Sequence, residues 1–381
     1  MSTQRRDLFV TTQTPVLRSG RAVRTHSIAR ALARHRGVDL LYVRFGASEP
    51  DASLRAIAGV ELCEVIPSRG LRRAFAYALA RAERVPPALA RAVSAELVDT
   101  ATRMALAPSR GRVIADGPDA AGALLRLARR RAVVYNAHNL ESAFRHQLGH
   151  ARAGERLRLR KFETRLLERF EESWMVSDAD IAGAHELAPH AKLRYVPNAV
   201  DVDAIRRTEP DMAACTAIFV ASFSYEPNRV ALAFLLDDVM PRVWSQLPEA
   251  KLKIVGGGLS ESPSSDPRVT ALGFVDDLNE AYVHCSCAVV PLLQGGGSPL
   301  KLVEALAYGL PVVATPRAAA GLRLHDGVDC VIADGADDFA TALAKVLREG
   351  APAIARQGRT LAERLYSIEA LSELVAPPCN A

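Results

Sequence analysis

Short apolar segments, each followed by a stretch of helical periodicity, recur from one end of the chain to the other, and the series starts a second time near its middle. This alternation is typical of parallel strands joined by helices that cover both faces of a sheet. The second start indicates two sheets in tandem. The sequence predicts strands at 7–12, 38–45, 60–66, 112–116, 132–138, 173–177 and 193–198, and then at 217–222, 251–258, 269–275, 287–293, 311–315 and 330–334.

Two doubly wound sheets in one chain define the expected domain organisation. Such sheets bind ligands at the carboxyl ends of their strands, so a pair of them places a ligand cleft between the domains. We predict an α/β protein of two Rossmann-like domains that face each other across a cleft, residues 1–200 and 201–354, with a C-terminal helix and tail, 355–381, packing back on the first. The main helices are expected at 22–35, 71–84, 155–170, 228–246, 299–308, 337–348 and 355–375.

The composition fits a globular enzyme. The chain has 381 residues, of which 49% are hydrophobic and 24% charged. No run reaches the roughly 20 apolar residues of a membrane span, and the N-terminus has too short an apolar core for a signal peptide, so we expect a cytoplasmic protein. The six cysteines are scattered and form no CxxC, which argues against disulfides and a zinc site.

Charge is distributed unevenly along the chain. Residues 1–200 hold 33 Arg and Lys against 20 Asp and Glu, whereas the rest hold 15 against 23. The basic half is either a solvated arginine-rich surface or a surface that attracts anions. The anion would be a phosphorylated acceptor or an anionic membrane that the protein contacts peripherally. Nucleic acid is not expected as a partner, because the basic helices 71–84 and 155–170 have no interleaved stacking aromatics.

The most informative segment is CAVVPLLQGGGSPLKLVEALAYGLPVVAT, residues 287–315. A strand is followed by three glycines, then Ser298 as the expected N-cap and Pro299 as the first helical residue. Free amides at such a helix start favour an anion such as a diphosphate, and Lys301 adds a full charge. Glu304 is placed to accept hydrogen bonds from a ribose diol. The alternative is an ordinary glycine-rich connection with a solvated glutamate.

Several other chemistries lack their motifs. Neither glycine cluster satisfies GxGxxG, which disfavours a nicotinamide dehydrogenase, and the Walker pattern is absent. No HExxH, GxSxG or Cys–His signature is present, so hydrolysis by these mechanisms is not expected.

The second half resembles the donor-binding domain of glycosyltransferases with the GT-B fold, and is most similar to glycosyltransferase family 4 (glycosyl transferases group 1). The matching blocks are VPNAVD (196–201), AIFVASFSYEPNRVALAFL, KLKIVGGG, VTALGFVDDL and GGGSPLKLVEALAYGLPVVAT, in the family's order and spacing. The resemblance is strong over 194–348 and looser over the N-terminal half.

This resemblance implies roles for individual residues. The glycine loop and the following helix would hold the donor diphosphate and ribose, the loop after 269–273 would contact the nucleobase, and His138 would contact the transferred sugar. The implied catalytic residues are His138, Lys301 and Glu304. The implied donor-binding residues are Gly20, Arg21, Ser222, Arg229, Gly273, Phe274, Val275, Gly295, Gly296, Gly297, Ser298, Pro299 and Leu300, and the acceptor-binding residues are Arg24 and Asn139.

The chain departs from the family pattern at three places. Gly296 stands where relatives often carry the first of two acidic residues. The block from Ser222 to Asn228 lacks the basic pair that often serves the diphosphate, which leaves Lys301 and Arg229 as candidates. Ala199 replaces a frequent glycine, so the backbone there need not adopt a positive φ.

The resemblance further implies sugar transfer with retention of configuration from a UDP- or GDP-type donor, without a metal or other cofactor. The acceptor would be a glycan, a lipid-linked or a small-molecule hydroxyl, in polysaccharide assembly for example. Two alternatives stay open: a catalytically degenerate binding protein and a sugar-nucleotide 2-epimerase of the same fold. Nucleotide-sugar binding without turnover would separate the first alternative from a transferase.

Overall fold

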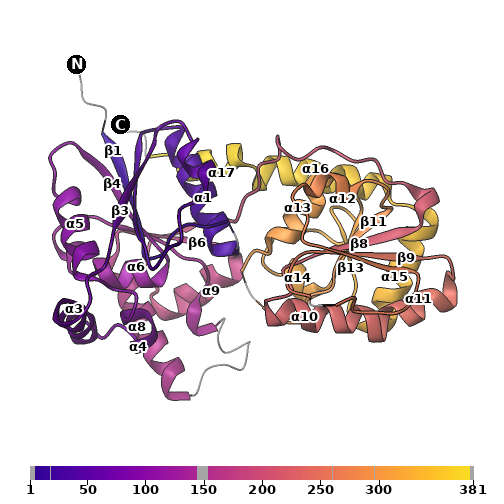
Figure 1. The fold of residues 1–381 in the computed structure, drawn as a ribbon, viewed down its shortest axis with the longest axis horizontal. Coiled ribbons are helices and arrows are strands. Elements are labelled where there is room, and N and C mark those ends of the chain that lie inside the picture. Colours follow the sequence, from indigo (N-terminus) through magenta and orange to yellow (C-terminus); the bar gives the residue numbers. More distant parts are fainter. Residues whose placement is uncertain (1–4, 18, 144–152, 260, 296, 378–381) are drawn as a thin grey trace. The chain divides into compact units, whose positions relative to one another are not determined.

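The protein is described by a computed structural model that covers all residues except 1–4, 18, 144–152, 260, 296 and 378–381. The chain divides into two compact units (Figure 1). Unit 1 comprises residues 1–198 and 368–381, and unit 2 comprises residues 199–367. The C-terminus therefore returns to the unit that contains the N-terminus.

Unit 1 is built on a seven-stranded parallel sheet with the order β3-β2-β1-β4-β5-β6-β7. The strand order reverses between β1 and β4, which is where doubly wound sheets bind their ligands. The strands are β1 (Arg6–Thr11), β2 (Val38–Val43), β3 (Val60–Val65), β4 (Arg110–Asp116), β5 (Val134–Asn136), β6 (Glu172–Met175) and β7 (Leu193–Tyr195).

Helices cover both faces of this sheet (Figure 1), as strands buried on both faces require. All six residues of β2 are buried, and Trp174 of β6 is fully enclosed. The helices are α1 (Gly20–Ala33), α2 (Ala52–Arg55), α3 (Leu71–Ala82), α4 (Pro87–Ala90), α5 (Ala95–Ala105), α6 (Gly117–Leu124), η1 (Leu127–Arg129), α8 (Ala153–Arg169), α9 (Asp178–Leu187) and α17 (Ile368–Leu374).

Unit 2 contains a second parallel sheet, of six strands, with the order β10-β9-β8-β11-β12-β13. Its strand order reverses between β8 and β11. The strands are β8 (Thr216–Val220), β9 (Lys251–Val255), β10 (Val269–Gly273), β11 (Cys287–Val290), β12 (Val312–Ala314) and β13 (Val331–Ile332). The predicted strands are thus confirmed in number and order.

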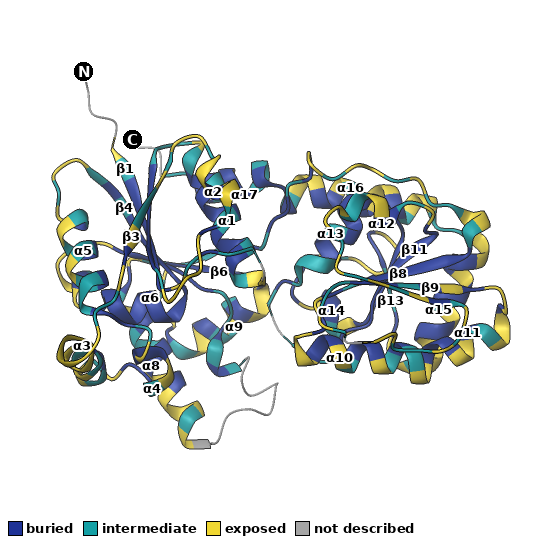
Figure 2. Cartoon of the chain, viewed as in Figure 1, coloured by how far each residue is buried: buried dark blue, intermediate teal, exposed yellow. Residues whose placement is uncertain are grey.

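The helices of unit 2 enclose a second hydrophobic core (Figure 2). They are η2 (Met212–Ala214), α10 (Glu226–Ala233), the π-helix η3 (Phe234–Val239), α11 (Met240–Gln246), α12 (Leu278–Tyr282), α13 (Leu300–Tyr308), α14 (Pro316–Ala319), α15 (Gly335–Glu349) and α16 (Pro352–Tyr366). The predicted helix 228–246 is interrupted by η3. Pro241 has no amide to donate to the preceding turn, and a local widening accommodates it.

The C-terminal segment differs from the expectation of one helical stretch that packs on the N-terminal domain. Ser367 has an extended backbone (φ −80°, ψ 163°) and separates α16 from α17. Helix α16 packs against α13 in unit 2, whereas α17 packs against α1 in unit 1. Among the described helices, none is long and apolar enough to cross a bilayer.

Candidate functional site

The glycine-rich connection after β11 leads directly into α13. Gly295 (φ 110°) and Gly297 (φ 71°) adopt backbone conformations that favour glycine, and the predicted donor contact Gly296 lies outside the described residues. The predicted cap was wrong by one residue: Pro299 is the N-cap and Leu300 begins the helix. Because Pro299 has an extended ψ of 110°, Ser298 lies outside the helix and does not cap it.

Lys301 is held at the first turn of α13 by a residue of a neighbouring helix. Its Nζ donates a hydrogen bond to Oδ1 of Asn228 in α10. The side-chain amide of Asn228 in turn donates to the carbonyl of Ser222 (2.6 Å), which follows β8. Lys301 therefore links the connections that follow β8 and β11, the two strands between which the strand order reverses. Asn228 was not identified from the sequence, where it stands among unremarkable polar residues.

Burial shifts both ionisable groups of α13 toward their neutral forms. It lowers the pKa of Lys301 to about 8, and it raises the pKa of Glu304 to about 7. The positive charge of Lys301 partly offsets the rise in the pKa of Glu304, and the negative charge of Glu304 partly offsets the fall in the pKa of Lys301. Among the described side chains, the two do not form a direct ion pair. A ligand with an anionic group at Lys301 and hydroxyls at Glu304 would supply what these groups lack.

Two stacked tyrosines lie beside Glu304. The rings of Tyr282 and Tyr308 are 3.7 Å apart at 10°, and both residues are almost fully buried. Burial and the Glu304 charge raise the pKa of both phenols. The Glu304 carboxylate is thus close enough for its charge to act on both phenols, while burial raises its own pKa. The pair comes from α12 and α13, so sequence spacing gave no sign of the stack.

Close backbone approaches fix the connections around this site. A Cβ at Gly256, after β9, would lie 1.7 Å from the carbonyl oxygen of Ala221. A Cβ at Gly321 would lie 1.7 Å from the carbonyl oxygen of Gly297. Arg317 of α14 also donates to the carbonyl of Gly295. Gly321 and Arg317 were not predicted, although both hold the glycine-rich connection in place.

The other predicted donor contacts of unit 2 lie at the same sheet edge. Ser222 and Arg229 are exposed after β8, and Arg229 donates to the carbonyl of Phe223 (3.0 Å). Gly273 (φ 67°) ends β10, and Phe274, which follows it, is 76% exposed. Val275 is half-buried. These residues leave backbone groups and one aromatic ring accessible at the edge.

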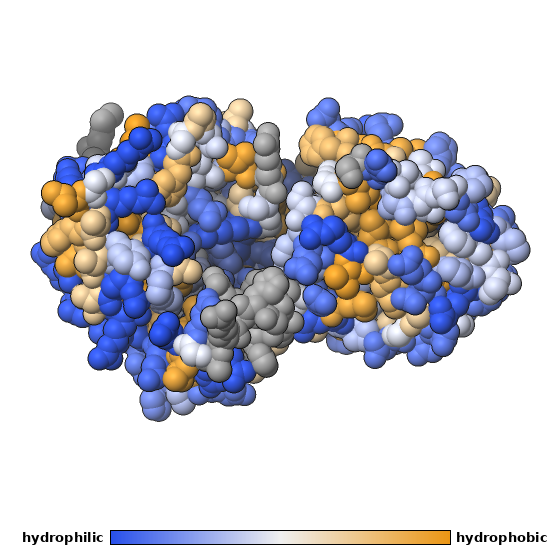
Figure 3. Space-filling model, turned by 60° about the horizontal axis from the view of Figure 1, so that its bottom comes forward, coloured by the Kyte–Doolittle hydropathy of each residue, from blue (hydrophilic) through white to orange (hydrophobic). Residues whose placement is uncertain are grey.

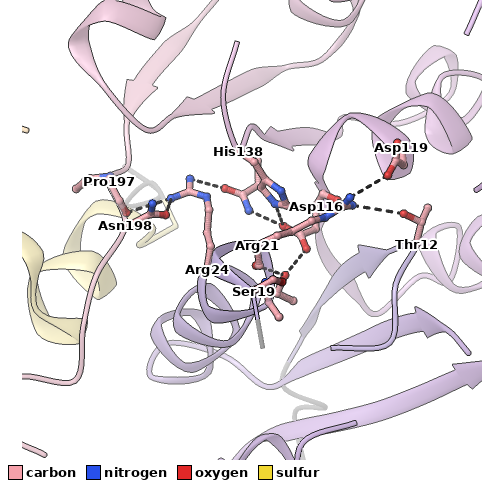
Figure 4. Close-up of polar contacts among 12 residues, drawn as sticks. Thr12, Ser19, Arg21, Arg24, Asp116, Asp119, His138, Pro197 and Asn198 are labelled. Atoms are coloured by element: carbon pink, nitrogen blue, oxygen red, sulfur yellow. Dashed lines mark hydrogen bonds and ion pairs between the residues drawn. The ribbon is translucent and has the colours of Figure 1, made fainter. Parts of the chain in front are cut away.

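The site edge of unit 1 is organised around Asp116, the last residue of β4 (Figure 4). The carboxylate is fully buried and accepts from the Thr25 hydroxyl (2.6 Å), the Asn136 amide (2.8 Å) and Nε2 of His138 (2.8 Å). These partners come from α1, from β5 and from the connection after β5. We call Asp116 with these three partners the Asp116 hub.

Electrostatics define the protonation states in the hub. Burial would raise the pKa of Asp116, but His138, Arg21 and the Thr25 hydroxyl outweigh it and lower that pKa to about 2. Burial lowers the pKa of His138. At neutral pH the carboxylate is therefore ionised and the imidazole neutral. Since the carboxylate can only accept, Nε2 carries the proton and Nδ1 is left as a hydrogen-bond acceptor.

Arg21 lies over the hub, near the start of α1. It pairs with Asp119 (2.9 Å) and donates to the carbonyl of Asp116 (3.3 Å) and the Thr12 hydroxyl (3.4 Å). A Cβ at Gly117 (φ 82°) would lie 2.9 Å from Arg21 Nη2 and 3.1 Å from the His138 ring. Glycine is thus required where α6 begins.

Arg24, predicted to contact the acceptor, has a different environment. It is only 2% exposed, and its guanidinium donates to Asn136 (2.6 Å), Asn198 (3.2 Å) and the carbonyl of Pro197 (3.1 Å). Burial lowers its pKa to about 10. In this conformation the guanidinium is enclosed by protein, because α1 packs its inward face against the strand ends.

The remaining predicted contacts of unit 1 are more accessible. Gly20 is exposed at the start of α1, where the Ser19 hydroxyl accepts from the amide of Ala22 (3.3 Å), and Asn139 is half-buried next to His138. Sequence reasoning missed Asp116. Its position at the end of an apolar strand was the available signal, but its partners are 20 or more residues away.

Each unit therefore carries a polar edge with a distinct chemistry. Unit 2 offers backbone amides, a lysine and a carboxylate for an anionic, hydroxylated ligand. Unit 1 offers a neutral histidine fixed by an ionised aspartate. Among the described residues, no three His, Cys, Asp or Glu side chains group in a way that would hold a metal ion.

Comparisons with known proteins show what the second unit is similar to. Residues 214–349 match the model of the glycosyl transferases group 1. A phosphatidyl-myo-inositol mannosyltransferase of Mycobacterium leprae (strain TN) is 33% identical over 144 residues, which are 35% of this chain and 37% of that protein. The match spans little more than a third of that relative's length. The predicted resemblance is confirmed at the level of group 1, and family 4 stays a prediction.

Solved structures share the fold over nearly the whole chain. HepE of Anabaena, in complex with UDP and glucose, has a TM-score of 0.69 at 16% identity over 97% of each chain. Sucrose-phosphate synthase of Thermosynechococcus elongatus has the same TM-score and coverage at 15% identity, and TarM reaches 0.71 at 9% identity over 98% of each chain. The GT-B fold of two Rossmann-like domains is thereby confirmed.

Proposed function

We propose that this chain, whose residues 214–349 match the model of the glycosyl transferases group 1, moves a sugar from a nucleoside-diphosphate donor to an acceptor hydroxyl. The observation that carries the proposal is the glycine-rich connection of unit 2, which enters α13 with Lys301 in its first turn and Glu304 one turn later. We assign donor binding to unit 2 and acceptor binding to unit 1.

The donor diphosphate would bind at the start of α13. The helix dipole, the amides of the connection and the charge of Lys301 all favour the negative charge that grows on the leaving phosphate. An anion there would also keep Lys301 protonated, against the burial that lowers its pKa to about 8. Glu304, beside the stacked tyrosines, would accept hydrogen bonds from the ribose hydroxyls.

UDP or GDP is the nucleotide that we propose for the donor. Support for UDP comes from HepE of Anabaena, which was solved in complex with UDP and with UDP-glucose. The backbone of Gly273 and Val275, with the exposed Phe274 ring between them, is suited to contact a nucleobase.

We propose that transfer proceeds with retention and without a metal. The acceptor oxygen forms its bond to the anomeric carbon on the face from which the diphosphate leaves. The bond between that carbon and the phosphate oxygen breaks, and the acceptor proton passes to an oxygen of the leaving diphosphate. The protein supplies orientation and charge stabilisation, so no carboxylate nucleophile is needed. In unit 1, Nδ1 of His138 would accept a hydrogen bond from a substrate hydroxyl, with Asn139 beside it.

The test is a transfer assay with UDP- and GDP-sugars against glycan, lipid-linked and small-molecule acceptors, with and without EDTA. We expect release of UDP or GDP that is insensitive to EDTA, and a product whose anomeric configuration, measured by NMR, equals that of the donor. Donor binding without turnover would favour the degenerate alternative. Formation of the 2-epimer without acceptor would favour the epimerase.

A further inference from the structure

Unit 1 carries a group of exposed hydrophobic side chains that its core does not use. Phe45 is 40% exposed, Ile66 62%, Leu71 89% and Phe75 63%. Phe45 follows β2, Ile66 follows β3, and the other two lie on α3. We call these four residues with Arg69 and Arg73 the α3 face. Hydrophobic side chains interrupt the hydrophilic surface on the side of unit 1 where α3 lies (Figures 1 and 3).

The structure brings these residues onto one surface. Val43 and Val65 are partners in neighbouring strands, so Phe45 and Ile66 follow at adjacent strand ends. The guanidinium of Arg73 lies 6.0 Å from the centre of the Phe45 ring, which joins α3 to these strand ends. Leu71 and Phe75 are four residues apart and so share one side of the helix.

The core contacts of α3 are made by the opposite side of the helix. Ala76 and Ala80 are its buried residues, and they lie away from Leu71 and Phe75 around the helix axis. Packing against unit 1 therefore does not require the two large exposed side chains. Large apolar side chains that gather exposed on one side of a domain are typical of an interaction surface.

The surface carries charges of both signs, but two of its arginines have no described acidic partner. Among the described residues, neither Arg69 nor Arg73 forms an ion pair. Arg72, between them, is shared by Glu96 and Asp99 at 3.7 Å each, and Arg44 is paired with Glu49 and Glu64. Arg69 and Arg73 thus contribute positive charge that no described acidic side chain pairs with.

We propose that the α3 face docks on an anionic phospholipid bilayer. Apolar side chains would enter the boundary between headgroups and acyl chains, while Arg69 and Arg73 attract the lipid phosphates. The face lies at the carboxyl ends of β2 and β3, the same sheet edge at which β4 presents the Asp116 hub. Resting on the proposed function, this placement favours a lipid-borne acceptor over a freely diffusing one.

The test measures partition of the full chain onto vesicles in low salt, without donor. We expect binding to vesicles of phosphatidylglycerol and phosphatidylcholine, and weak binding to phosphatidylcholine alone. The double variant Arg69→Glu and Arg73→Glu should lower the partition coefficient by about 30-fold or more, because the loss of each arginine lowers it by about fivefold. Leu71→Ser with Phe75→Ser should lower it by at least about tenfold.

The matched control is the double variant Arg158→Glu and Arg160→Glu on α8, which removes the same exposed charge from a helix that is not part of the α3 face. We expect this pair to change partition by less than about threefold. An equal loss in the control, no binding to anionic vesicles, or equal binding to neutral vesicles would each overturn the proposal. UDP affinity, measured on the same variants, should be unchanged and reports separately on the proposed function.

Discussion

The site edges of the two units satisfy their charges in different ways. In unit 1 the Asp116 carboxylate accepts three side-chain hydrogen bonds, and its pKa falls to about 2. In unit 2 the corresponding edge contains Lys301 and Glu304, which form no direct ion pair among the described residues. Burial lowers the pKa of Lys301 to about 8 and raises that of Glu304 to about 7. The Asp116 carboxylate is satisfied by protein side chains, whereas Lys301 donates only to Asn228 within the part of the chain that the structure describes.

This contrast separates a preorganised edge from one that awaits a ligand. A satisfied buried network stabilises the fold and fixes side-chain orientation, as the hub does for His138. Desolvated charges with few partners reduce stability, and they are retained where a ligand completes them. The predictions below test whether the two edges differ in this way.

The largest effect is expected at Asp116. Asp116→Asn removes the buried charge that the hub surrounds, so we expect the free energy of unfolding of unit 1 to fall by about 3 kcal/mol or more at pH 7. The Asp116 carboxylate has a depressed pKa, so its contribution is present above about pH 4 and is lost as the pH falls toward 2. The loss caused by the variant should shrink over that range in urea denaturation.

Asp119→Asn is the matched control, because Asp119 forms an ion pair with Arg21 but stands outside the hub. An equal loss of stability in both variants would contradict the central position of Asp116.

The second effect concerns the glycine-rich connection. Gly321→Ala places a Cβ 1.7 Å from the carbonyl oxygen of Gly297, so the connection must move. We expect a loss of about 2 kcal/mol in the stability of unit 2 and weaker UDP binding by calorimetry. Gly257→Ala is the control, since its Cβ meets only Phe274 at 3.7 Å. If both variants bind UDP equally well, the connection does not form the donor site.

Glu304 should respond to pH with the opposite sign to Asp116. Its folded pKa of about 7 exceeds the ordinary value, so ionisation destabilises the fold as the pH rises through that range. Glu304→Gln should therefore be more stable than the wild type at pH 8, by about 1 to 2 kcal/mol. The difference should vanish near pH 4, as followed by thermal denaturation. A variant less stable than the wild type at pH 8 would show that Glu304 is already satisfied.

The smallest effect is expected at Phe274. Its ring is largely exposed, so Phe274→Ala should leave stability unchanged and weaken UDP binding by about two- to fivefold. Leu272→Ala, at an exposed apolar position within β10, provides the comparison. Equal affinities in both variants and the wild type would remove the ring from the proposed nucleobase contact.

The fold and the unit 2 edge could be predicted because their signals are local. Parallel strands buried on both faces appear as continuous apolar runs, and the three glycines, Lys301 and Glu304 lie within ten residues of one another. The one-residue error at Ser298 arose because proline is compatible with both the N-cap and the first helical position.

The unit 1 edge could not be predicted in the same way. Asp116, Thr25 and Asn136 come from three separate elements, and only the order of the strands brings them together. Arg24 was predicted to contact the acceptor because it follows the loop that resembles the family's glycine-rich loop, whereas here three acceptors enclose it. The stacked Tyr282 and Tyr308 likewise depend on how α12 packs against α13.

Calorimetric titration of UDP, and of GDP as a second probe, into the wild type and Lys301→Ala tests the account most directly. We predict saturable binding of one nucleotide to the wild type and a loss of about 10- to 100-fold in Lys301→Ala, as expected for a charge-assisted hydrogen bond. Lys345→Ala, at an exposed position of α15, should bind like the wild type. Undiminished affinity in Lys301→Ala would contradict the placement of the donor site in unit 2.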